Sequence, residues 1–452
     1  MLKKKVLALL LAAALVTAFV PLAASAAAPI NFECTNFENF VRGRINRPAG
    51  NIYPTDVSRV DDIFAFGHNI VSLAGIEYFA ALRHLSISSN YLTTLDVSRN
   101  TALEELVVRA EQLTELDVSR NTALKSLDVV NHQLTELDVS RNTALIELYV
   151  CGNQLTELDV SHNIELEFLS VWGNQLTELD VSRNTVLSSL NVQNNQLTEL
   201  DVSHNPALAF LNANENQLTE LDVSRNTALI ELRVWGNQLT TLDVSHNTAL
   251  ELLSVWGNQL TELDVSRNTS LEVLDIGQNQ LTELDVSRNP ALEFLNASEN
   301  QLTELDVSRN TVLIELHVWG NQLVELDVSR NTAYVDNGTA VVLDGHTLSF
   351  DVSAQMIGGR TMLPLRAIFE QMGADVEWNA ATQTATATKG GTVVVLTVGS
   401  VSPTVNGVVV PIDQPGIIID GRTLAPLRFV AEAFGGTVEW DAATQTATIT
   451  TG

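Results

Sequence analysis

The hydrophobic and polar positions of this chain repeat with a period of twenty-one residues. Versions of LTELDVSRNTA recur twelve times, with their aspartates at every twenty-first position from Asp96 to Asp327. No insertion or deletion breaks this spacing. Such a period is typical of stacked arrays, in which each unit is one turn and buries its apolar side only against its neighbours. The pattern therefore predicts an elongated solenoid whose function lies on repeated surface columns.

Each turn divides into two related halves of eleven and ten residues that share the form L-x-x-L-x-V-x-x-N. The leucine and valine positions point inward, and their alternation predicts a short strand in each half. In the turn that starts at Leu92, the inward residues are Leu92, Leu95, Val97, Leu103, Leu106 and Val108. One turn alone buries too little apolar surface to fold, so we expect successive turns to be joined by backbone hydrogen bonds.

Asparagine marks the end of each half. One column runs from Asn100 to Asn331, and a second runs from Asn90 to Asn321 with Glu111 and His132 as interruptions. A buried amide at a bend can bond the backbone groups that the bend leaves without partners. Both columns are therefore expected to be buried ladders of side-chain hydrogen bonds.

The pattern L-x-x-L-x-L-x-x-N-x-L resembles the leucine-rich repeat family in its short bacterial form. The resemblance covers residues 82–333, about twelve turns. It implies a β-rich repeat solenoid with one parallel strand per turn on a concave face, and a binding role through that face. Because both halves look strand-like here, the opposite side is either an irregular arm or a second sheet.

Two segments precede the repeats. Residues 1–26 carry three lysines, an apolar run and a final Ala24-Ser25-Ala26, which together predict a secretory signal peptide rather than a membrane-spanning helix. Residues 27–81 have no repeat, and they place Phe37, Phe40, Val41 and Ile45 at helical spacing. This second segment is expected to be a helical cap over the first turn, as repeat arrays require.

The composition changes to Gly, Val and Thr in residues 334–452. Two related passages begin at Gly359 and Gly421, with GRTMLPLR or GRTLAPLR followed by VEWNAATQTATAT or VEWDAATQTATIT. Two β-β-α-β-β units in a small α+β domain are predicted. This stretch resembles the copper amine oxidase N-terminal-like domain, also called a stalk domain. The resemblance implies an accessory module without oxidase chemistry that attaches or spaces the protein at the cell wall.

Charge and cysteine content limit the partners. The formal net charge is −29, which disfavours nucleic acid and anionic lipid as ligands. No membrane-spanning segment is expected once the signal peptide is removed. Cys34 and Cys151 are the only cysteines, and they lie far apart along the array, so we expect no disulfide between them.

The repeated half of each turn exposes charged columns: the aspartates, the glutamates from Glu115 to Glu325, and the arginines from Arg99 to Arg330. We interpret them as a solvated ladder in which arginines offset carboxylate repulsion. A ladder of calcium ions between carboxylates is the alternative, although the loop spacing of dedicated calcium repeats is absent. No metal site or cofactor is predicted.

The other half of each turn varies at two outward positions and carries large aromatic side chains there. The candidate ligand-binding residues are Tyr149, Trp172, Arg233, Trp235, Trp256, His317 and Trp319. Exposed aromatic rings beside polar donors are typical of surfaces that bind proteins or sugars. The alternative interpretation is that each tryptophan only fills a turn and packs over its neighbour. Trp235 and Trp256, on adjacent turns near Arg233, are expected to form the centre of a recognition face.

No catalytic pattern is present. His162, His204 and His246 are two turns apart, and no zinc spacing, phosphate loop or nucleophile elbow occurs. The sequence therefore predicts a non-enzymatic binding protein, secreted or held at a bacterial cell envelope, with a protein or carbohydrate ligand. A structural envelope protein whose repeats supply only length is the alternative. A third hypothesis is an enzyme subunit that depends on a separate catalytic chain.

Overall fold

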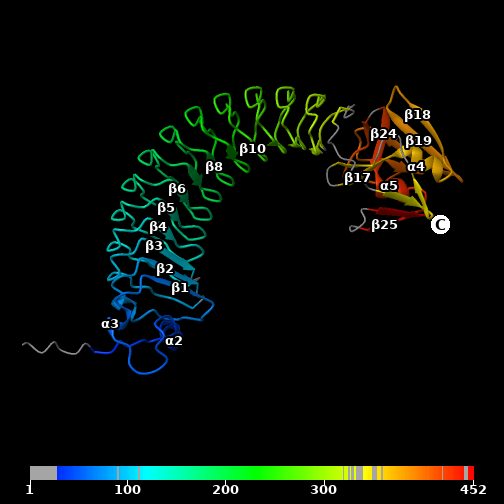
Figure 1. Cartoon of the computed structure of the whole chain (residues 1–452). Coiled ribbons are helices and arrows are strands. Elements are labelled where there is room, and N and C mark those ends of the chain that lie inside the picture. Colours follow the sequence, from blue (N-terminus) through cyan, green and yellow to red (C-terminus); the bar gives the residue numbers. More distant parts are fainter. Residues whose placement is uncertain are drawn as a thin grey trace, which may run out of the picture.

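The computed structural model describes residues 28–88, 91–109, 112–318, 320–323, 326, 330–331, 340–348, 354–357, 360–419, 421–441 and 446–451. The predicted signal peptide and Trp319 lie outside these residues. A curved rod of stacked turns leads into a separate C-terminal domain (Figure 1). Within the described ranges, no helix is long and apolar enough to cross a membrane.

A single thirteen-stranded parallel sheet runs through the rod in sequence order. Paired residues in the repeats are one period apart, as in Leu253 with Leu274. The first three strands are five residues long: β1 (Asp62–Phe66), β2 (His84–Ser88) and β3 (Glu105–Arg109). The others have three residues: β4 (Ser126–Asp128), β5 (Glu147–Tyr149), β6 (Phe168–Ser170), β7 (Ser189–Asn191), β8 (Phe210–Asn212), β9 (Glu231–Arg233), β10 (Leu252–Ser254), β11 (Val273–Asp275), β12 (Phe294–Asn296) and β13 (Glu315–His317).

The prediction of a strand in each half is wrong for the half that contains the repeated Leu-Asp-Val. Among the described turns this half carries no strand, so it is an irregular arm and not a second sheet. Its polar groups bond locally instead: Asp180 Oδ1 accepts from the Ser182 amide at 2.8 Å, and the Asn184 amide donates to the Val181 carbonyl at 3.0 Å. Local turns of this kind compete with a strand ladder for the backbone groups.

Leucine and valine side chains form one continuous core along the rod, and most of them are fully buried. The predicted asparagine ladders are confirmed in the described turns; Asn90 and Glu111 of the second column lie outside the described residues. Asn226 Nδ2 donates to the carbonyl oxygens of Val202 and Asn205 in the preceding turn, both at 2.9 Å. In the second ladder His132 takes the place of an asparagine, with Nε2 2.7 Å from the Val108 carbonyl oxygen. The bends therefore join successive turns through side chains where backbone pairing stops.

The N-terminal cap contains helices α2 (Thr35–Arg44) and α3 (Pro54–Val57) and the short 3-10 helix η1 (Ile76–Tyr78). Phe37 and Val41 from α2 are buried and belong to the same core as the repeats. The helix therefore closes the first turn, because its apolar side replaces the missing preceding repeat. Cys34 and Cys151 are both buried and free, which confirms the expectation of no disulfide between them.

The C-terminal domain contains the predicted pair of β-β-α-β-β units. The first is β16 (Gln355–Ile357), β17 (Arg360–Pro364), α4 (Leu365–Gln371), β18 (Asp375–Asn379) and β19 (Thr384–Lys389); the second is β23 (Ile417–Ile419), β24 (Arg422–Pro426), α5 (Leu427–Glu432), β25 (Thr437–Asp441) and β26 (Thr446–Thr450). The remaining strands are β14 (Ala340–Leu343), β15 (His346–Leu348), β20 (Thr392–Thr397), β21 (Thr404–Val405) and β22 (Val408–Val409). Strands β17 and β24 pair antiparallel, so one sheet joins the two units.

This domain contacts the last turn of the rod directly. The Leu326 amide donates to the Ile418 carbonyl at 3.2 Å, and Leu326 forms a parallel bridge with Ile419. Ile357, Met362, Ile419 and Leu424 of the domain are buried in the same core as the repeat leucines. The apolar end of the array is thus covered by β23 and its neighbours, which act as a C-terminal cap.

Candidate ligand-binding faces

The outward side chains of the parallel strands form the first candidate surface, which we call the sheet face. It has three rows of side chains, each with one residue per turn. In the turn of β9, Glu231 belongs to the first row, Arg233 to the middle row and Trp235, just past the strand end, to the third row. The sequence pointed to the second and third rows only. The missed first row contains Phe168, Phe210, Leu252, Val273 and Phe294 among polar residues. Strict alternation along each strand would have found it, because residues two apart share a face.

The predicted residues do not all come together. Trp235, Trp256 and Arg233 lie on the adjacent strands β9 and β10 or just after them. Trp172 is three turns before Trp235, and His317 is four turns after Arg233. Tyr149 lies one turn before Trp172, half-buried, and its burial raises the pKa of its hydroxyl. The sheet face therefore has one aromatic centre and separate outlying residues.

Trp235 and Trp256 form the aromatic centre. Their ring centroids are 6.1 Å apart at an interplanar angle of 69°, an edge-to-face arrangement. Trp256 is 36% exposed, and Trp172, in the same row, is 39% exposed. The Trp235 amide donates to Asn214 Oδ1 at 2.9 Å, which fixes the backbone of the first ring. Both rings pack over a neighbour and also keep a surface open to solvent.

The middle row beside the tryptophans is a hydrogen-bonded polar strip. Asn296 Nδ2 donates to Asp275 Oδ1 at 2.9 Å, and Ser254 Oγ donates to Asp275 Oδ2 at 3.4 Å. Burial raises the pKa of Asp275, because the charged carboxylate loses water there. At the ends of this strip, Arg233 pairs with Glu231 at 3.0 Å and His317 Nε2 lies 2.7 Å from Glu315 Oε1.

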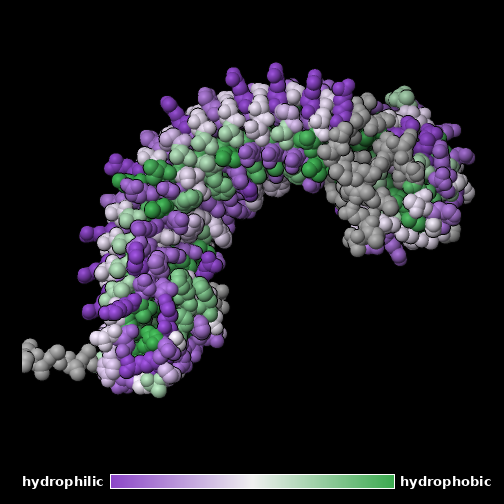
Figure 2. Space-filling view, in the orientation of Figure 1, coloured by the Kyte–Doolittle hydropathy of each residue, from purple (hydrophilic) through white to green (hydrophobic). Residues whose placement is uncertain are grey.

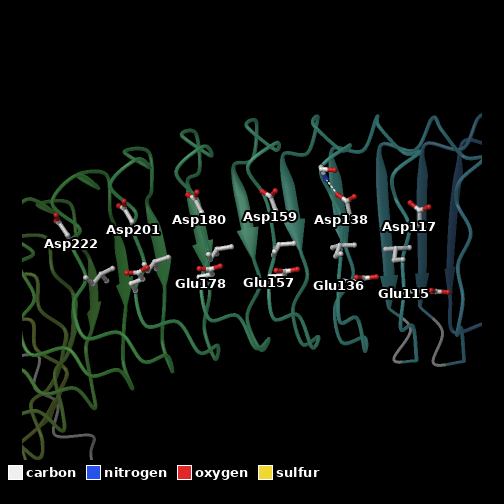
Figure 3. A pocket seen from close by; sticks show the side chains of 18 of the residues that line it. Glu115, Asp117, Glu136, Asp138, Glu157, Asp159, Glu178, Asp180, Asp201 and Asp222 are labelled. Atoms are coloured by element: carbon white, nitrogen blue, oxygen red, sulfur yellow. Dashed lines mark hydrogen bonds between the residues drawn. The ribbon is translucent and has the colours of Figure 1, made fainter.

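The second candidate surface is a groove of about 2030 Å³ along the irregular arms, which we call the acidic groove. Figure 3 shows aspartates on one side, glutamates on the other and leucine side chains between them. The lining includes the aspartates from Asp96 to Asp243 and the glutamates from Glu115 to Glu220, and no basic residue. Figure 2 shows how hydrophilic side chains also project from the outer rim of the rod.

The aspartates of this groove bond within their own turn. Asp117 Oδ1 accepts from the Ser119 amide at 2.8 Å, and the equivalent bond recurs along the column. Hydrogen bonds from the Ser119 hydroxyl and amide lower the pKa of Asp117, and the charge of Arg120 lowers it further. Arg120 thus acts on Asp117 through its charge, as the expected offset between the two columns requires. Three or more metal-type ligands do not converge anywhere in the described part of the chain.

Strand placement, inward leucines and asparagine-marked bends define the rod as a leucine-rich repeat solenoid of about twelve turns, followed by a small α+β domain. Residues 342–449 match the family model described as Copper amine oxidase N-terminal domain. The chain is similar to the functional domain of InlJ from Listeria monocytogenes, with 28% sequence identity and a TM-score of 0.63. The match covers 81% of this chain and 94% of the InlJ domain.

Two further solved structures share the fold. An internalin, InlF, from Listeria monocytogenes has 23% identity and a TM-score of 0.61, and the match covers 69% of this chain and 96% of that chain. A leucine-rich repeat protein of Leptospira interrogans has 23% identity and a TM-score of 0.50, with coverage of 60% and 79%. Comparison with curated proteins finds no match. The rod is therefore similar in fold to solved bacterial leucine-rich repeat proteins, an internalin among them, and nothing in these matches points to catalysis.

Proposed function

We propose that this protein is an exported, non-catalytic binding protein that captures a protein or glycan ligand on its sheet face at the cell envelope. The observation that carries the proposal is the solvent-open pair Trp235 and Trp256 beside the polar strip that contains Asp275. Large aromatic rings next to fixed polar groups dominate binding energy at recognition surfaces. Capture is non-covalent, and Arg233 supplies a charged group at one edge of the aromatic centre.

The remaining candidate residues extend the same face. Tyr149, Trp172 and His317 lie on the sheet face outside the aromatic centre, and Trp319 is included in the proposal from the sequence alone. We assign these residues to peripheral contacts, because binding energy concentrates in a few central side chains and the surrounding ones mainly exclude water.

A double variant, Trp235→Ala with Trp256→Ala, tests the proposal. The full mature chain is applied to arrays of secreted proteins and of oligosaccharides, and captured ligands are then measured against the variant. Loss of capture by the variant, together with retained capture by Trp172→Ala, supports the proposed centre. Equal capture by wild type and double variant shows that the ligand binds elsewhere.

The alternative function is a structural envelope protein whose solenoid provides only length. The unbroken period and the capped ends favour it, because a rigid rod needs both. Absence of any ligand for the wild-type chain on both arrays would support this function. Export itself is tested by N-terminal sequencing of the secreted protein, where a mature chain that begins after Ala26 is expected.

We further propose that the C-terminal domain attaches or spaces the solenoid at the envelope. Its resemblance to stalk domains and its position at the end of the rod support this role. Cell fractionation of the producing bacterium tests it: full-length protein in the wall fraction supports attachment, and protein only in the medium contradicts it.

A further inference from the structure

The polar strip of the sheet face extends from the middle row into the third row. Ser298 Oγ donates to Asn296 Oδ1 at 2.6 Å, and the Ser298 amide donates to the same oxygen at 3.1 Å. Ser298 is almost completely buried, whereas Asp275 and Asn296 remain partly open to solvent. A chain of hydrogen bonds therefore runs from Ser254 through Asp275 and Asn296 to Ser298 and fixes each polar group.

Gly277 holds this strip against Trp256. A side-chain carbon added at Gly277 would lie 2.6 Å from Trp256 Cδ1, 2.9 Å from Asn296 Nδ2 and 3.1 Å from Ser298 Oγ. These three groups already converge over the glycine, so the ring edge of Trp256 rests beside the amide of Asn296. The absence of a side chain at Gly277 thus sets the distance between the aromatic ring and the polar strip.

The sheet face carries few charged side chains in this region. From β9 to β12, three described side chains of the sheet face are charged: Glu231 and Arg233, which form an ion pair, and Asp275. The other side chains of the face there are neutral. The bonding partners of Asp275 are the neutral groups of Ser254, Asn296 and the Gly277 amide. A carboxylate and an amide held in fixed positions can bond hydroxyl groups, and an exposed indole beside them can stack on the apolar C–H face of a sugar ring.

We infer that Trp235, Trp256, Asp275 and Asn296 form a subsite for the sugar rings of a neutral glycan, with Gly277 and Ser298 as positioning residues. The inference rests on the proposed function and narrows its ligand class from protein or glycan to glycan. One sugar ring stacks on Trp256 and donates hydroxyl hydrogen bonds to Asp275, while Asn296 bonds a second hydroxyl. Polar groups one strand apart, about 4.8 Å, allow an extended oligosaccharide to lie along the strip.

The test measures binding of the full mature chain to immobilised neutral oligosaccharides built from glucose, galactose, mannose and N-acetylglucosamine. A lysine-rich peptide is the competing cationic probe, because a lysine side chain could instead pair with Asp275. We expect capture of at least one neutral oligosaccharide with little dependence on salt, and no capture of the peptide. Asp275→Asn should weaken glycan binding about tenfold or more, because it replaces a charged acceptor. Burial raises the pKa of Asp275, so the neutral variant is expected to fold.

Gly277→Ala tests the positioning role without removing a contact residue. Its added carbon pushes the Trp256 ring away, so glycan binding should fall and the tryptophan emission spectrum should shift, while Thr227→Ala, at an exposed bend outside the sheet face, leaves binding unchanged. Salt-sensitive capture of the lysine-rich peptide in place of glycans would overturn the inference. Capture of a protein through Trp235 and Trp256 without any glycan would overturn it and leave the proposed function standing. Failure of every oligosaccharide here and of every protein on the array described above would remove both.

Discussion

The two asparagine ladders should differ in their contribution to stability. Asn226→Ala removes a side-chain amide from the first ladder, and Asn237→Ala removes one from the second ladder in the following half-turn. Asn237 Nδ2 donates to the carbonyls of Ala213 at 2.9 Å and Val234 at 3.0 Å, and its Oδ1 accepts from the Leu218 amide at 3.0 Å. Asn226 makes the two donor bonds only, because its Oδ1 has no partner.

The size of the difference follows from what each variant leaves behind. The carbonyls bonded by Asn226 keep a second partner, since Val202 O accepts from the Asn205 amide and Asn205 O from the Leu208 amide. Each lost bond then costs about 1 kcal/mol, so we expect about 2 kcal/mol for Asn226→Ala. Asn237→Ala loses two similar bonds and a longer one to the Trp235 carbonyl at 3.4 Å, and it also leaves the buried Leu218 amide without its acceptor, so we expect about 4 kcal/mol.

Urea unfolding of the full chain, followed by tryptophan fluorescence and circular dichroism, measures both free energies of unfolding. Thr227→Ala is the matched control, because Thr227 is exposed and follows Asn226 directly. Its expected effect is within about 0.5 kcal/mol of zero. Equal losses for the two asparagine variants, or a larger loss for Asn226→Ala, would refute the reasoning from unsatisfied backbone groups.

Three further predictions concern the cap, the turns and the aspartate column. Ile419→Asp places a charge in the core shared by the last turn and the C-terminal domain, so it should destabilise the protein by about 3 kcal/mol or more and increase hydrogen exchange around Leu326. The control is Val408→Asp at an exposed site, which should change neither the stability nor the hydrogen exchange. Gly236 has a φ of +68°, and an added side-chain carbon would meet only ordinary contacts, the nearest 3.6 Å away at Glu215. Gly236→Ala should therefore cost about 1 kcal/mol in thermal unfolding through backbone strain, while Gly236→Asn costs less; equal effects would argue against this reasoning. Hydrogen bonds lower the pKa of the repeated aspartates at every twenty-first position from Asp96 to Asp285, so these carboxylates bind protons less tightly in the folded state than in the unfolded chain. Their stabilisation is present above the ordinary aspartate pKa of about 4 and is lost as the pH falls below it. The melting temperature should therefore drop below about pH 4, and Asp222→Asn should reduce that drop slightly; a flat profile in this range would contradict the prediction.

The contact between the C-terminal domain and the rod changes how the domain is understood. A flexible spacer would leave the last repeat exposed, whereas Leu326 here bonds to β23 and shares a core with Met362 and Leu424. The domain therefore stabilises the end of the array, in addition to any role at the envelope. No pattern in the sequence indicates this contact, because the apolar residues of β23 and β24 look like ordinary core positions of their own domain.

The amino-acid sequence alone determined the solenoid, its twenty-one-residue turn, the cap helix with Phe37, the asparagine ladders and the two β-β-α-β-β units. These features depend on local periodicity, and each turn meets only its neighbours, so the pattern of one turn fixes the next. Which half of the turn forms the sheet is known from the three-dimensional structure, because it depends on whether backbone groups pair between turns or within the Asp-x-Ser bend. The period already placed Trp235 and Trp256 on adjacent turns and Trp172 three turns away, whereas the edge-to-face contact of the two rings and the approach of Asn296 to Trp256 at Gly277 come from the structure. Those distances arise from packing across several turns, which residue spacing does not specify.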